Sequence, residues 1–454
     1  MKLSIAHALR VDSSPCIAFT GAGGKTTALF QLARTLSNDK GQPPVTVTAT
    51  SHLGAWQFEL ADEHIITNSP SQLEELEHGL KGVILVTGEM DGERSTPIND
   101  NLLNWLHQFC GYHSIPLLIE ADGSRQKPLK AWSEHEPPIP SFVKQVVQVV
   151  GLSGLGKLLG DEYVHRPEIF SRISGLNMGA TVTAEELTRV LTHPEGGLKN
   201  IPKEARSIIL LNQADTNDLQ SAANGMVQTL LSAFDSVIVS SLKEERIYAV
   251  HEPIAGIILA AGESTRYGQT KQLLDWRGEP FVRVVARTAL DAGLSPIFVV
   301  TGANAEKVEL SLKGLDIKVV QNTEWKSGQG SSIGTGIHAL QPPVGLTGTN
   351  RVGGAIFLLT DQPQITTSII RALVEKHAEG LYPIVVPIVM DQRANPVLFD
   401  RSTFNDLLSI KGDMGGRAIF HKHRVEYLPW HDDRLLLDVD TPEMYQRLIS
   451  DETL

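Results

Sequence analysis

The chain has 454 residues, a hydrophobic fraction of 41% and a formal net charge of −12, so it is longer than one ordinary domain and acidic overall. The excess of acidic residues argues against a general nucleic-acid-binding surface, which would need a basic patch. No apolar stretch approaches the roughly 20 residues that cross a bilayer, and the first residues lack the apolar core of a secretion signal. We therefore expect a cytoplasmic protein with neither a membrane nor a nucleic-acid partner.

Short apolar and β-branched runs alternate with helical periodicity through the first half of the chain. Thr183 and Glu186 form a predicted capping box for a helix that continues through Leu191. Another helix is predicted over 26–36, where apolar residues recur on one face. The predicted strands are 16–20, 45–50, 83–87, 116–121, 207–211 and 236–240. This alternation is typical of a parallel α/β fold.

A glycine-rich segment, Gly21-Ala-Gly-Gly-Lys-Thr-Thr27, separates the first predicted strand from the first long helix. Backbone amides in such a loop can cradle phosphates, Lys25 can reach them, and Thr26 can bind magnesium. The segment ends like a P-loop, although Phe19 stands where the usual pattern has its first glycine. Asp122, at the end of a later strand, is the predicted acid on the metal side. The predicted nucleotide-binding residues are Gly21, Gly23, Gly24, Lys25, Thr26 and Thr27.

A polar segment, Asn212-Gln-Ala-Asp215, follows a later predicted strand. It resembles the guanine-reading motif Asn-Lys-x-Asp, with glutamine in the place of lysine. A polar turn from strand to helix is the other interpretation, and it is favoured by the sequence alone. The choice between ATP and GTP in the first half therefore stays open.

A charged stretch and a proline near residue 250 separate the two halves, so we predict one domain over 1–250 and a second over 251–454. The second half again alternates strands and helices, with predicted strands at 254–260, 297–301, 317–321, 355–359 and 384–389. The predicted fold class is α/β, with a P-loop NTPase-like domain followed by a Rossmann-like domain.

A second glycine-containing loop, Leu259 to Lys271, follows the strand over 254–260. Its small residues would let backbone amides approach the phosphates of a nucleotide, while Arg266 and Lys271 supply positive charge. The predicted nucleotide-binding residues are Leu259, Ala260, Ala261, Gly262, Ser264, Arg266 and Lys271.

Two aspartates follow apolar runs in the second half. Asp361 comes after the strand over 355–359, where a carboxylate would emerge at the carboxyl end of the sheet. Asp440 comes after another apolar run, and the two side chains could hold one or two Mg²⁺ ions. In isolation, Asp361 could instead form a turn and Asp440 could cap the helix that follows.

From about residue 254 to its end, the chain resembles the molybdenum cofactor cytidylyltransferases of the MobA-like nucleotidyltransferase superfamily. The resemblance is carried by an ordered set of motifs: 259–271, 322–332, Leu359-Thr-Asp361-Gln-Pro363, Asn395-Pro-Val-Leu-Phe399, 412–417 and Asp438-Val-Asp440-Thr-Pro442. It implies transfer of CMP from CTP to molybdenum-bound molybdopterin with release of pyrophosphate. A sugar or polyol phosphate is the alternative acceptor.

The resemblance also implies roles for individual residues. Arg266, Lys271 and Asp361 would be catalytic, with Mg²⁺ held by Asp361 and Asp440. In this superfamily an Ala-Ala-Gly loop accompanies cytidylyl transfer, and Ala260-Ala261-Gly262 has that form. One departure lies at Arg393-Ala394-Asn395, where relatives commonly have glycine next to the last residue. The molybdopterin-type substrate would meet Asn322, Gly330, Ser331, Ser332 and Asn395.

Residues 1 to about 250 resemble the YqeC-like family, which is associated with selenium-dependent molybdenum hydroxylases. The segments on which this resemblance rests are 21–27, 118–130, His135-Glu-Pro137, 150–154, His165-Arg-Pro-Glu168 and 193–197. The glycine loop itself looks like the shortened version in Mur ligases. The resemblance implies an accessory domain that uses ATP or GTP in a step linked to cofactor maturation, with an apo molybdenum hydroxylase as a possible partner. A nucleotide-gated chaperone that delivers the cofactor is the alternative.

Overall fold

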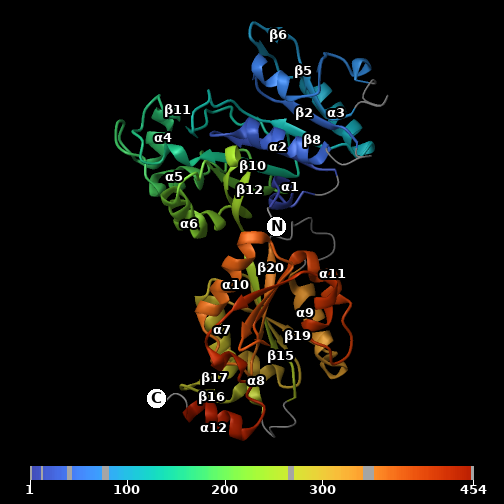
Figure 1. Cartoon of the computed structure of the whole chain (residues 1–454), viewed down its shortest axis with the longest axis vertical. Helices are drawn as coiled ribbons and strands as arrows, with labels where there is room; N and C mark the ends of the chain where they lie inside the picture. The colour runs from blue at the N-terminus through green and yellow to red at the C-terminus, as the bar shows by residue number, and fades with distance from the viewer. Residues whose placement is uncertain are drawn as a thin grey trace. The chain divides into compact units, whose positions relative to one another are not determined.

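A computed structural model gives the fold and describes residues 3–11, 14–37, 43–73, 81–263, 270–340 and 352–450. The chain divides into two compact units, Met1–His251 and Glu252–Leu454. Each unit has its own central β-sheet (Figure 1). None of the described helices combines the length and the apolar character that a membrane crossing requires.

The elements of the first unit alternate along the chain as strands and helices. The strands are β1 (Cys16–Gly21), β2 (Val45–Ala49), β3 (Leu53–Gly54), β4 (Glu63–Ile66), β5 (Val83–Thr87), β6 (Met90–Asp91), β7 (Arg94–Ser95), β8 (Leu117–Glu120), β9 (Leu129–Lys130), β10 (Gln145–Gly151), β11 (Val164–His165), β12 (Arg206–Asn212), β13 (Ser236–Ser241) and β14 (Arg246–His251). The helices are α1 (Ile5–Ala8), α2 (Lys25–Ser37), α3 (Asp100–Tyr112), α4 (Pro167–Ser174), α5 (Ala184–Leu191) and α6 (Asn217–Leu231).

The main sheet of the first unit has nine strands among the described residues, in the order β14-β13-β12-β10-β1-β8-β2-β5-β4. Neighbouring strands run parallel, except that β14 pairs antiparallel with β13. Helix α2 packs on β1, β2 and β8, and α6 packs on β13. Because parallel strands need crossover connections, these helices cover the sheet and bury apolar residues against it. The predicted α/β class is confirmed.

Three strands of this sheet, β4, β10 and β14, escaped the sequence analysis. Strand β4 has four residues and none of them is buried, so it lacks the apolar run that marks a central strand. In β10, Gln145 and Gln148 interrupt the apolar run, yet both side chains are buried, and Gln145 Nε2 donates to the carbonyl oxygen of Leu9 at 2.9 Å. The charged stretch before residue 250 forms a short 3-10 turn, Leu242–Glu244, and reaches β14 only with Arg246, the exposed first residue of this edge strand, where charged side chains are tolerated. The capping box is as predicted: Glu186 accepts from the backbone N–H of Thr183, whose own side chain accepts from the N–H of Glu185.

The second unit follows the same alternation. Its strands are β15 (Ile254–Ala260), β16 (Asp275–Trp276), β17 (Glu279–Pro280), β18 (Ile297–Thr301), β19 (Lys318–Gln321), β20 (Gly354–Leu359), β21 (Ile384–Val389), β22 (Gln392–Arg393), β23 (Val397–Asp400) and β24 (Val425–Pro429). Its helices are α7 (Phe281–Asp291), α8 (Ala305–Ser311), α9 (Gln329–Leu340), α10 (Thr367–Gly380), α11 (Phe404–Leu408) and α12 (Pro442–Ser450).

The sheet of the second unit has eight strands among the described residues, in the order β19-β18-β15-β20-β23-β21-β22, with β24 paired to β21. Alternate residues of β15 face opposite sides: Ile258 packs in the cluster with α7 and α10, and Ile257 in the cluster with α9 and α11. Figure 1 shows these helix pairs on either side of the sheet. The sheet is therefore buried on both faces, although it is mixed, with β23 antiparallel to β20 and β21.

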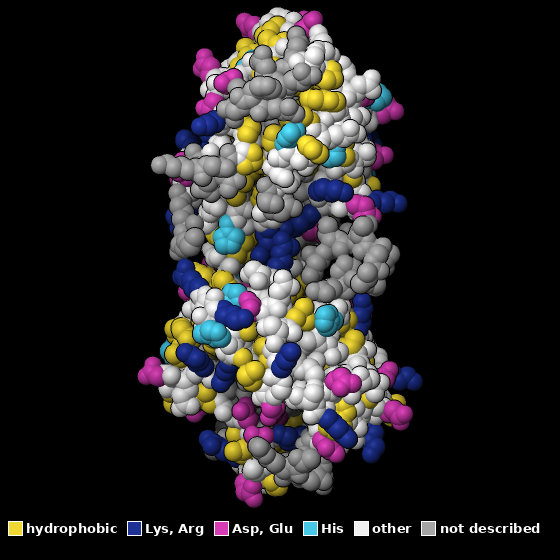
Figure 2. All heavy atoms as spheres, turned by 90° about the vertical axis from the view of Figure 1, so that its right-hand side faces the viewer, with side chains coloured by type: hydrophobic (Ala, Val, Ile, Leu, Met, Phe, Trp, Pro, Cys, Tyr) yellow, Lys and Arg dark blue, Asp and Glu magenta, His cyan; other side chains and the backbone are white. Residues whose placement is uncertain are grey.

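The surface carries both signs of charge. On the face drawn in Figure 2, acidic and basic side chains are interspersed over much of the surface, with hydrophobic side chains among them. This distribution fits a composition of 40 basic and 52 acidic residues.

Candidate functional site

The glycine segment between β1 and α2 forms a tight turn at the carboxyl end of β1. Gly21, Gly23 and Gly24 have φ angles of 97°, 76° and 121°, in the region that favours glycine. A Cβ on Gly21 would lie 2.2 Å from the carbonyl oxygen of Val149, and one on Gly23 would lie 2.3 Å from the Cα of Gly151. Glycine is therefore required by the backbone conformation and by the close approach of β10.

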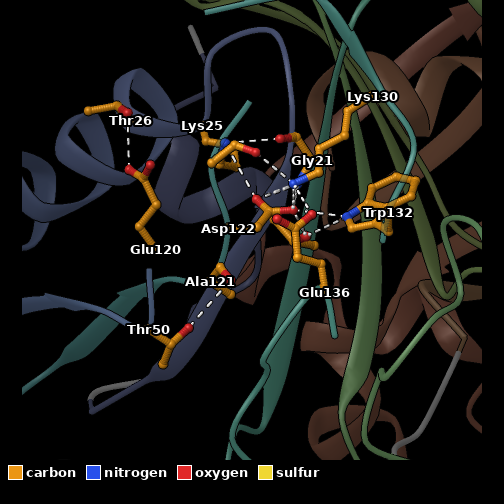
Figure 3. A network of polar contacts seen from close by, with 12 residues as sticks. Gly21, Lys25, Thr26, Thr50, Glu120, Ala121, Asp122, Lys130, Trp132 and Glu136 are labelled. Carbon is orange, nitrogen blue, oxygen red and sulfur yellow. Dashed lines mark hydrogen bonds and ion pairs between the residues drawn. The ribbon is translucent and has the colours of Figure 1, made fainter. Parts of the chain in front are cut away.

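Lys25, the first residue of α2, is folded back over this turn. Its Nζ donates to the carbonyl oxygen of Gly21 at 2.9 Å and lies 3.4 Å from Oδ1 of Asp122, and the residue is only 4% exposed (Figure 3). The ammonium group thus lies at the turn, between a carbonyl oxygen and a carboxylate.

Asp122 is the centre of a buried network that braces the turn. Its carboxylate accepts from Thr20 Oγ1 at 2.8 Å, from Trp132 Nε1 at 2.9 Å and from the N–H of Gly21 at 3.1 Å, and Lys130 Nζ lies 2.9 Å away (Figure 3). Burial alone would raise the pKa of Asp122, but Lys25 and Lys130 hold it below the usual value. These donors occupy the carboxylate that was predicted as a metal ligand, so its evident role in this structure is to anchor the turn.

Glu120, at the end of β8, is the carboxylate that meets Thr26. Thr26 Oγ1 donates to Glu120 Oε2 at 3.0 Å, and Gln57 Nε2 lies 2.9 Å from Thr26 Oγ1 and 3.3 Å from the same carboxylate. Burial raises the pKa of Glu120, although Lys25 and Thr26 oppose the shift. Glu120 therefore joins Thr26 as a candidate metal-side group. The sequence analysis named its segment but not this contact, which depends on β8 pairing with β1.

A hollow of about 710 Å³ lies along α2. Thr26 and Thr27 line it next to the glycine turn, Phe30 and Trp56 provide apolar surface, and Leu242 comes from the segment after β13. Trp56 is 55% exposed, which is unusual for a large aromatic side chain. The turn is thus flanked by a hollow of the size that small-molecule sites have.

The charged network predicts a specific stability effect. Lys130 is fully buried between Asp122 and Glu136, each 2.9 Å away. Asp122→Ala leaves Lys25 and Lys130 without their shared buried partner, so we expect the free energy of unfolding to fall by about 3–5 kcal/mol. Urea denaturation measures this change. Asp161→Ala, which removes an exposed partner of Lys127, is the control and should have little effect; equal effects of both variants would contradict the account.

In the second unit, four parallel strands bring the predicted residues to one sheet edge. Strands β19, β18, β15 and β20 run parallel, so their carboxyl ends lie at the same edge. Ala261 follows β15, Gly302 follows β18, Asn322 follows β19 and Asp361 closely follows β20. A Cβ on Gly302 would lie 2.4 Å from the carbonyl oxygen of Ala261, so the first two loops are in close contact.

The loop after β15 is braced from the segment that follows it. Ala260 and Ala261 are buried, Leu259 is half-buried and Gly262 is exposed. Gln272 Nε2 donates to the carbonyl oxygen of Gly262 at 2.7 Å. Two further predicted residues of this loop, Ser264 and Arg266, lie outside the described residues.

Lys271 joins the two predicted metal ligands. Its Nζ donates to Asp440 Oδ1 at 2.7 Å and lies 3.6 Å from Asp361 Oδ2. The backbone N–H of Val439 donates to the carbonyl oxygen of Asp361 at 3.0 Å, which fixes the two segments to each other. Three residues widely separated in the sequence therefore meet beside the Gly262 loop.

Asp361 has the most unusual electrostatic environment of this group. Burial, Asp438 and Asp440 raise its pKa to about 6, against the opposing effect of Lys271. Its Oδ1 is buried and accepts no hydrogen bond from any described residue. Within the described ranges, no three His, Cys, Asp or Glu side chains are arranged as a complete metal site. Two observations nevertheless fit a divalent ion at this place. Asp361 Oδ1 has no partner, and Asp361 and Asp440 already share one positive group, the ammonium of Lys271. A bound nucleotide would supply the remaining ligands of the ion.

Three of the predicted substrate residues meet at the start of α9. Asn322 is 3% exposed, and its Nδ2 donates to Ser331 Oγ at 2.8 Å and to Ser332 Oγ at 3.0 Å. The N–H of Gly330 donates to the carbonyl oxygen of Gly412 at 3.0 Å. In the described part of the chain, this set of hydrogen bonds does not extend to Asn395, which is half-buried just before β23.

The sequence analysis missed two supporting residues of the second site. Gln362 Nε2 donates to Asp438 Oδ1 at 2.6 Å, and burial raises the pKa of Asp438. Both residues belong to motifs that were recognised, Leu359–Pro363 and Asp438–Pro442, but only the tertiary structure shows that these motifs touch.

The metal interpretation predicts a pH dependence. Asp361 must be ionised to bind a cation, and a carboxyl with a pKa of about 6 takes up its proton as the pH falls through 6. Between pH 7 and pH 5 we therefore expect Mn²⁺ affinity at this site to fall about tenfold. Titration calorimetry measures it, with Asp361→Asn abolishing the site and Asp316→Asn as an exposed control. An affinity that stays constant over this range would contradict the assignment.

Both units are thus α/β structures that present a glycine loop and acidic residues at the carboxyl edge of a sheet. The family described as YqeC protein matches residues 17–168, and the MobA-like NTP transferase domain matches residues 256–427. The uncharacterized protein YqeC of Escherichia coli (strain K12) is 32% identical over 218 residues, which are 47% of this chain and 82% of that protein. The chain belongs to the YqeC family and carries a MobA-like nucleotidyltransferase domain after its YqeC domain.

Two further relatives each match less than half of this chain. Nicotine blue oxidoreductase of Paenarthrobacter nicotinovorans is 29% identical over 205 residues, 43% of this chain and 96% of that protein. A probable molybdenum cofactor guanylyltransferase of Bacillus cytotoxicus is 24% identical over 147 residues, 32% of this chain and 66% of that protein. These relatives bear different activities in their names.

Proposed function

We propose that the second unit is a molybdenum cofactor cytidylyltransferase, which transfers CMP from CTP to molybdenum-bound molybdopterin and releases pyrophosphate. The observation that carries the proposal is the contact of Lys271 with Asp440 and Asp361 beside the Gly262 loop. The MobA-like family and the name of the Bacillus cytotoxicus relative support a molybdenum cofactor nucleotidyltransferase.

The proposed reaction joins two anions, so its main requirement is neutralisation of charge. A terminal phosphate oxygen of the pterin attacks the α-phosphorus of CTP, a new P–O bond forms, and the bond to pyrophosphate breaks. Asp361, Asp438 and Asp440 all act on one another electrostatically, while Lys271 is the cation in contact with two of them. Bound Mg²⁺ would supply the positive charge that lets a triphosphate approach these carboxylates.

The chain's own residues would divide the remaining tasks. Asp361 and Asp440 would hold the cation, and Lys271, released from them, would pair with phosphate oxygens together with Arg266. Amides of the loop over 259–262 would cradle the phosphates. We assign the pterin to the surface near Asn322, Gly330, Ser331, Ser332 and Asn395. Asn322 is a positioning residue there, because its side-chain amide already donates to the two serines and accepts from the N–H of Glu324.

The preference for CTP rests on the form of the loop. Ala260-Ala261-Gly262 is the version that accompanies cytidylyl transfer in the superfamily this unit resembles. Ala261 is buried against Gly302, so its methyl group adds to the packing between the first two loops.

Turnover tests this assignment. The full chain with CTP, Mg²⁺ and molybdenum-loaded molybdopterin should release pyrophosphate, and Asp361→Ala and Lys271→Ala should each lower kcat by about 100-fold or more because transition-state charge is left unbalanced. Lys313→Ala and Asp316→Ala alter exposed residues of the same unit and serve as matched controls. Undiminished turnover in both site variants would refute the site, and turnover only with a sugar or polyol phosphate would refute the acceptor.

For the first unit, we propose that the glycine turn over Gly21–Thr27 is a P-loop that binds the phosphates of ATP or GTP. Lys25 would pair with a phosphate, and Thr26 with Glu120 would hold Mg²⁺. The positive φ angles of the turn, the position of Lys25 and the adjoining hollow support this role. The bound nucleotide would drive or gate a step that passes the cofactor to an apo molybdenum hydroxylase.

Nucleotide binding by the full chain tests the first unit. Lys25→Ala removes the charge-assisted contact to a phosphate, so we expect affinity for ATP or GTP to fall about 10- to 100-fold. Equilibrium dialysis measures this affinity, with the exposed Lys203→Ala as the control. Equal affinities in the two variants would contradict the proposed P-loop.

An oxidoreductase is the second candidate for the second unit. It is favoured by the relative from Paenarthrobacter nicotinovorans, whose name states that activity and which matches this chain over 96% of its own length. Oxidation of NADH or NADPH by the full chain, with nicotine blue as the electron acceptor and without CTP, would support it. Pyrophosphate release without such oxidation would exclude it in favour of the transferase.

A further inference from the structure

The loop after β12 lies on the same sheet edge as the glycine turn of the first unit. In the sheet, β10 separates β12 from β1, and all three strands are parallel. Two strand spacings amount to roughly 10 Å, a separation that a nucleotide can bridge when its phosphates lie at the turn and its base lies further along the edge. The segment Asn212-Gln-Ala-Asp215 is therefore placed where a base would be read.

Asn212 fixes this loop to two others. It is 4% exposed, its Nδ2 donates to the carbonyl oxygen of Gly23 at 2.8 Å, and its Oδ1 accepts from the N–H of Leu242 at 2.9 Å. The N–H of Ala214 also donates to the carbonyl oxygen of Ser240 at 3.0 Å. The loops after β1, β12 and β13 are thus held in fixed relation. A simple polar turn would not need a buried amide that bridges three loops.

Asp215 has no structural task in this arrangement. The residue that caps α6 is Thr216, whose hydroxyl accepts from the N–H of Leu219, so the helix does not use the aspartate. Asp215 is exposed, and its carboxylate makes no hydrogen bond or ion pair with any residue that the structure describes. Two acceptor oxygens are therefore open on a rigid loop.

The chemistry of the bases decides what these oxygens can recognise. Guanine presents two neighbouring donors, N1–H and the exocyclic N2–H, which match the two oxygens of a carboxylate. Adenine has an acceptor at N1, so a carboxylate there would face another lone pair. We propose that the first unit is selective for guanine nucleotides and that Asp215 reads the base. This inference rests on the proposed binding of phosphates by the Gly21–Thr27 turn.

The hollow along α2 adjoins two of the three loops that Asn212 connects. The hollow along α2 borders Thr26 and Thr27 on one side and Leu242 on another, so open space adjoins the loops after β1 and β13. Gln213 takes the place that lysine has in the Asn-Lys-x-Asp pattern, and its Oε1 accepts from Ser153 Oγ at 2.5 Å. It thereby ties the loop to the segment after β10.

Calorimetric titration of the full chain with GDP, ADP and xanthosine diphosphate tests the inference. Wild-type protein should prefer GDP over ADP, and Asp215→Asn should weaken GDP about 10- to 100-fold. The same variant should strengthen xanthosine diphosphate, because xanthine has a carbonyl where guanine has its amino group and an asparagine amide can donate to it. Asp218→Asn, an exposed acid three residues further on, is the matched control and should change neither affinity.

Lys25→Ala identifies which binding belongs to the first unit, since the second unit can also bind nucleotides. Guanine selectivity that survives Asp215→Asn, or equal GDP and ADP affinities in the wild type, would overturn the role of Asp215 while leaving the phosphate site intact. If Lys25→Ala removes no nucleotide binding at all, the proposed P-loop fails, and the base reading fails with it.

Discussion

Parallel pairing of strands is the constraint on which both candidate sites depend. When neighbouring strands run in the same direction, every connecting loop at their carboxyl ends lies along one edge. In the first unit this edge carries the glycine turn, Thr26 with Glu120, and the loop that contains Asn212. In the second unit it carries the Gly262 loop, Asn322 and Asp361. Parallel strand pairing is therefore sufficient to bring residues that are distant in the sequence together.

In both units the key lysine is held by carboxylates. Lys25 is tied to Asp122 and to a carbonyl of its own turn, and Lys271 is tied to Asp440 and Asp361. The two cases differ in what the carboxylates do next. Asp122 is saturated by other donors and keeps a structural role when Lys25 turns to a phosphate. Asp361 and Asp440 are the proposed metal ligands, so a cation that binds them would free Lys271 for the nucleotide. Metal and nucleotide binding should then favour each other in the second unit.

The sequence predicts which segments form strands and helices better than it predicts the contacts between them. Apolar runs and the capping box at Thr183 suffice to identify most central strands and one helix start, because these signals are local. Strand β10 escapes because Gln145 is satisfied by a carbonyl far away in the sequence. The meeting of Thr26 with Glu120 and of Gln362 with Asp438 depends on strand register and on loop packing, which no local pattern encodes. For the same reason, the sequence alone cannot decide whether Asn212–Asp215 is a base-reading motif or a polar turn. The contacts of Asn212 with two other loops favour the motif.

The central claim is that Asp361 and Asp440 hold a cation while Lys271 moves to a triphosphate. Anomalous diffraction from crystals of the full chain grown with Mn²⁺ and a non-hydrolysable CTP analogue tests it directly. The account predicts a manganese peak bonded to Asp361, with Lys271 turned from Asp440 to the phosphates. Manganese bound elsewhere, with the contact between Lys271 and Asp440 still intact beside a bound nucleotide, would contradict it.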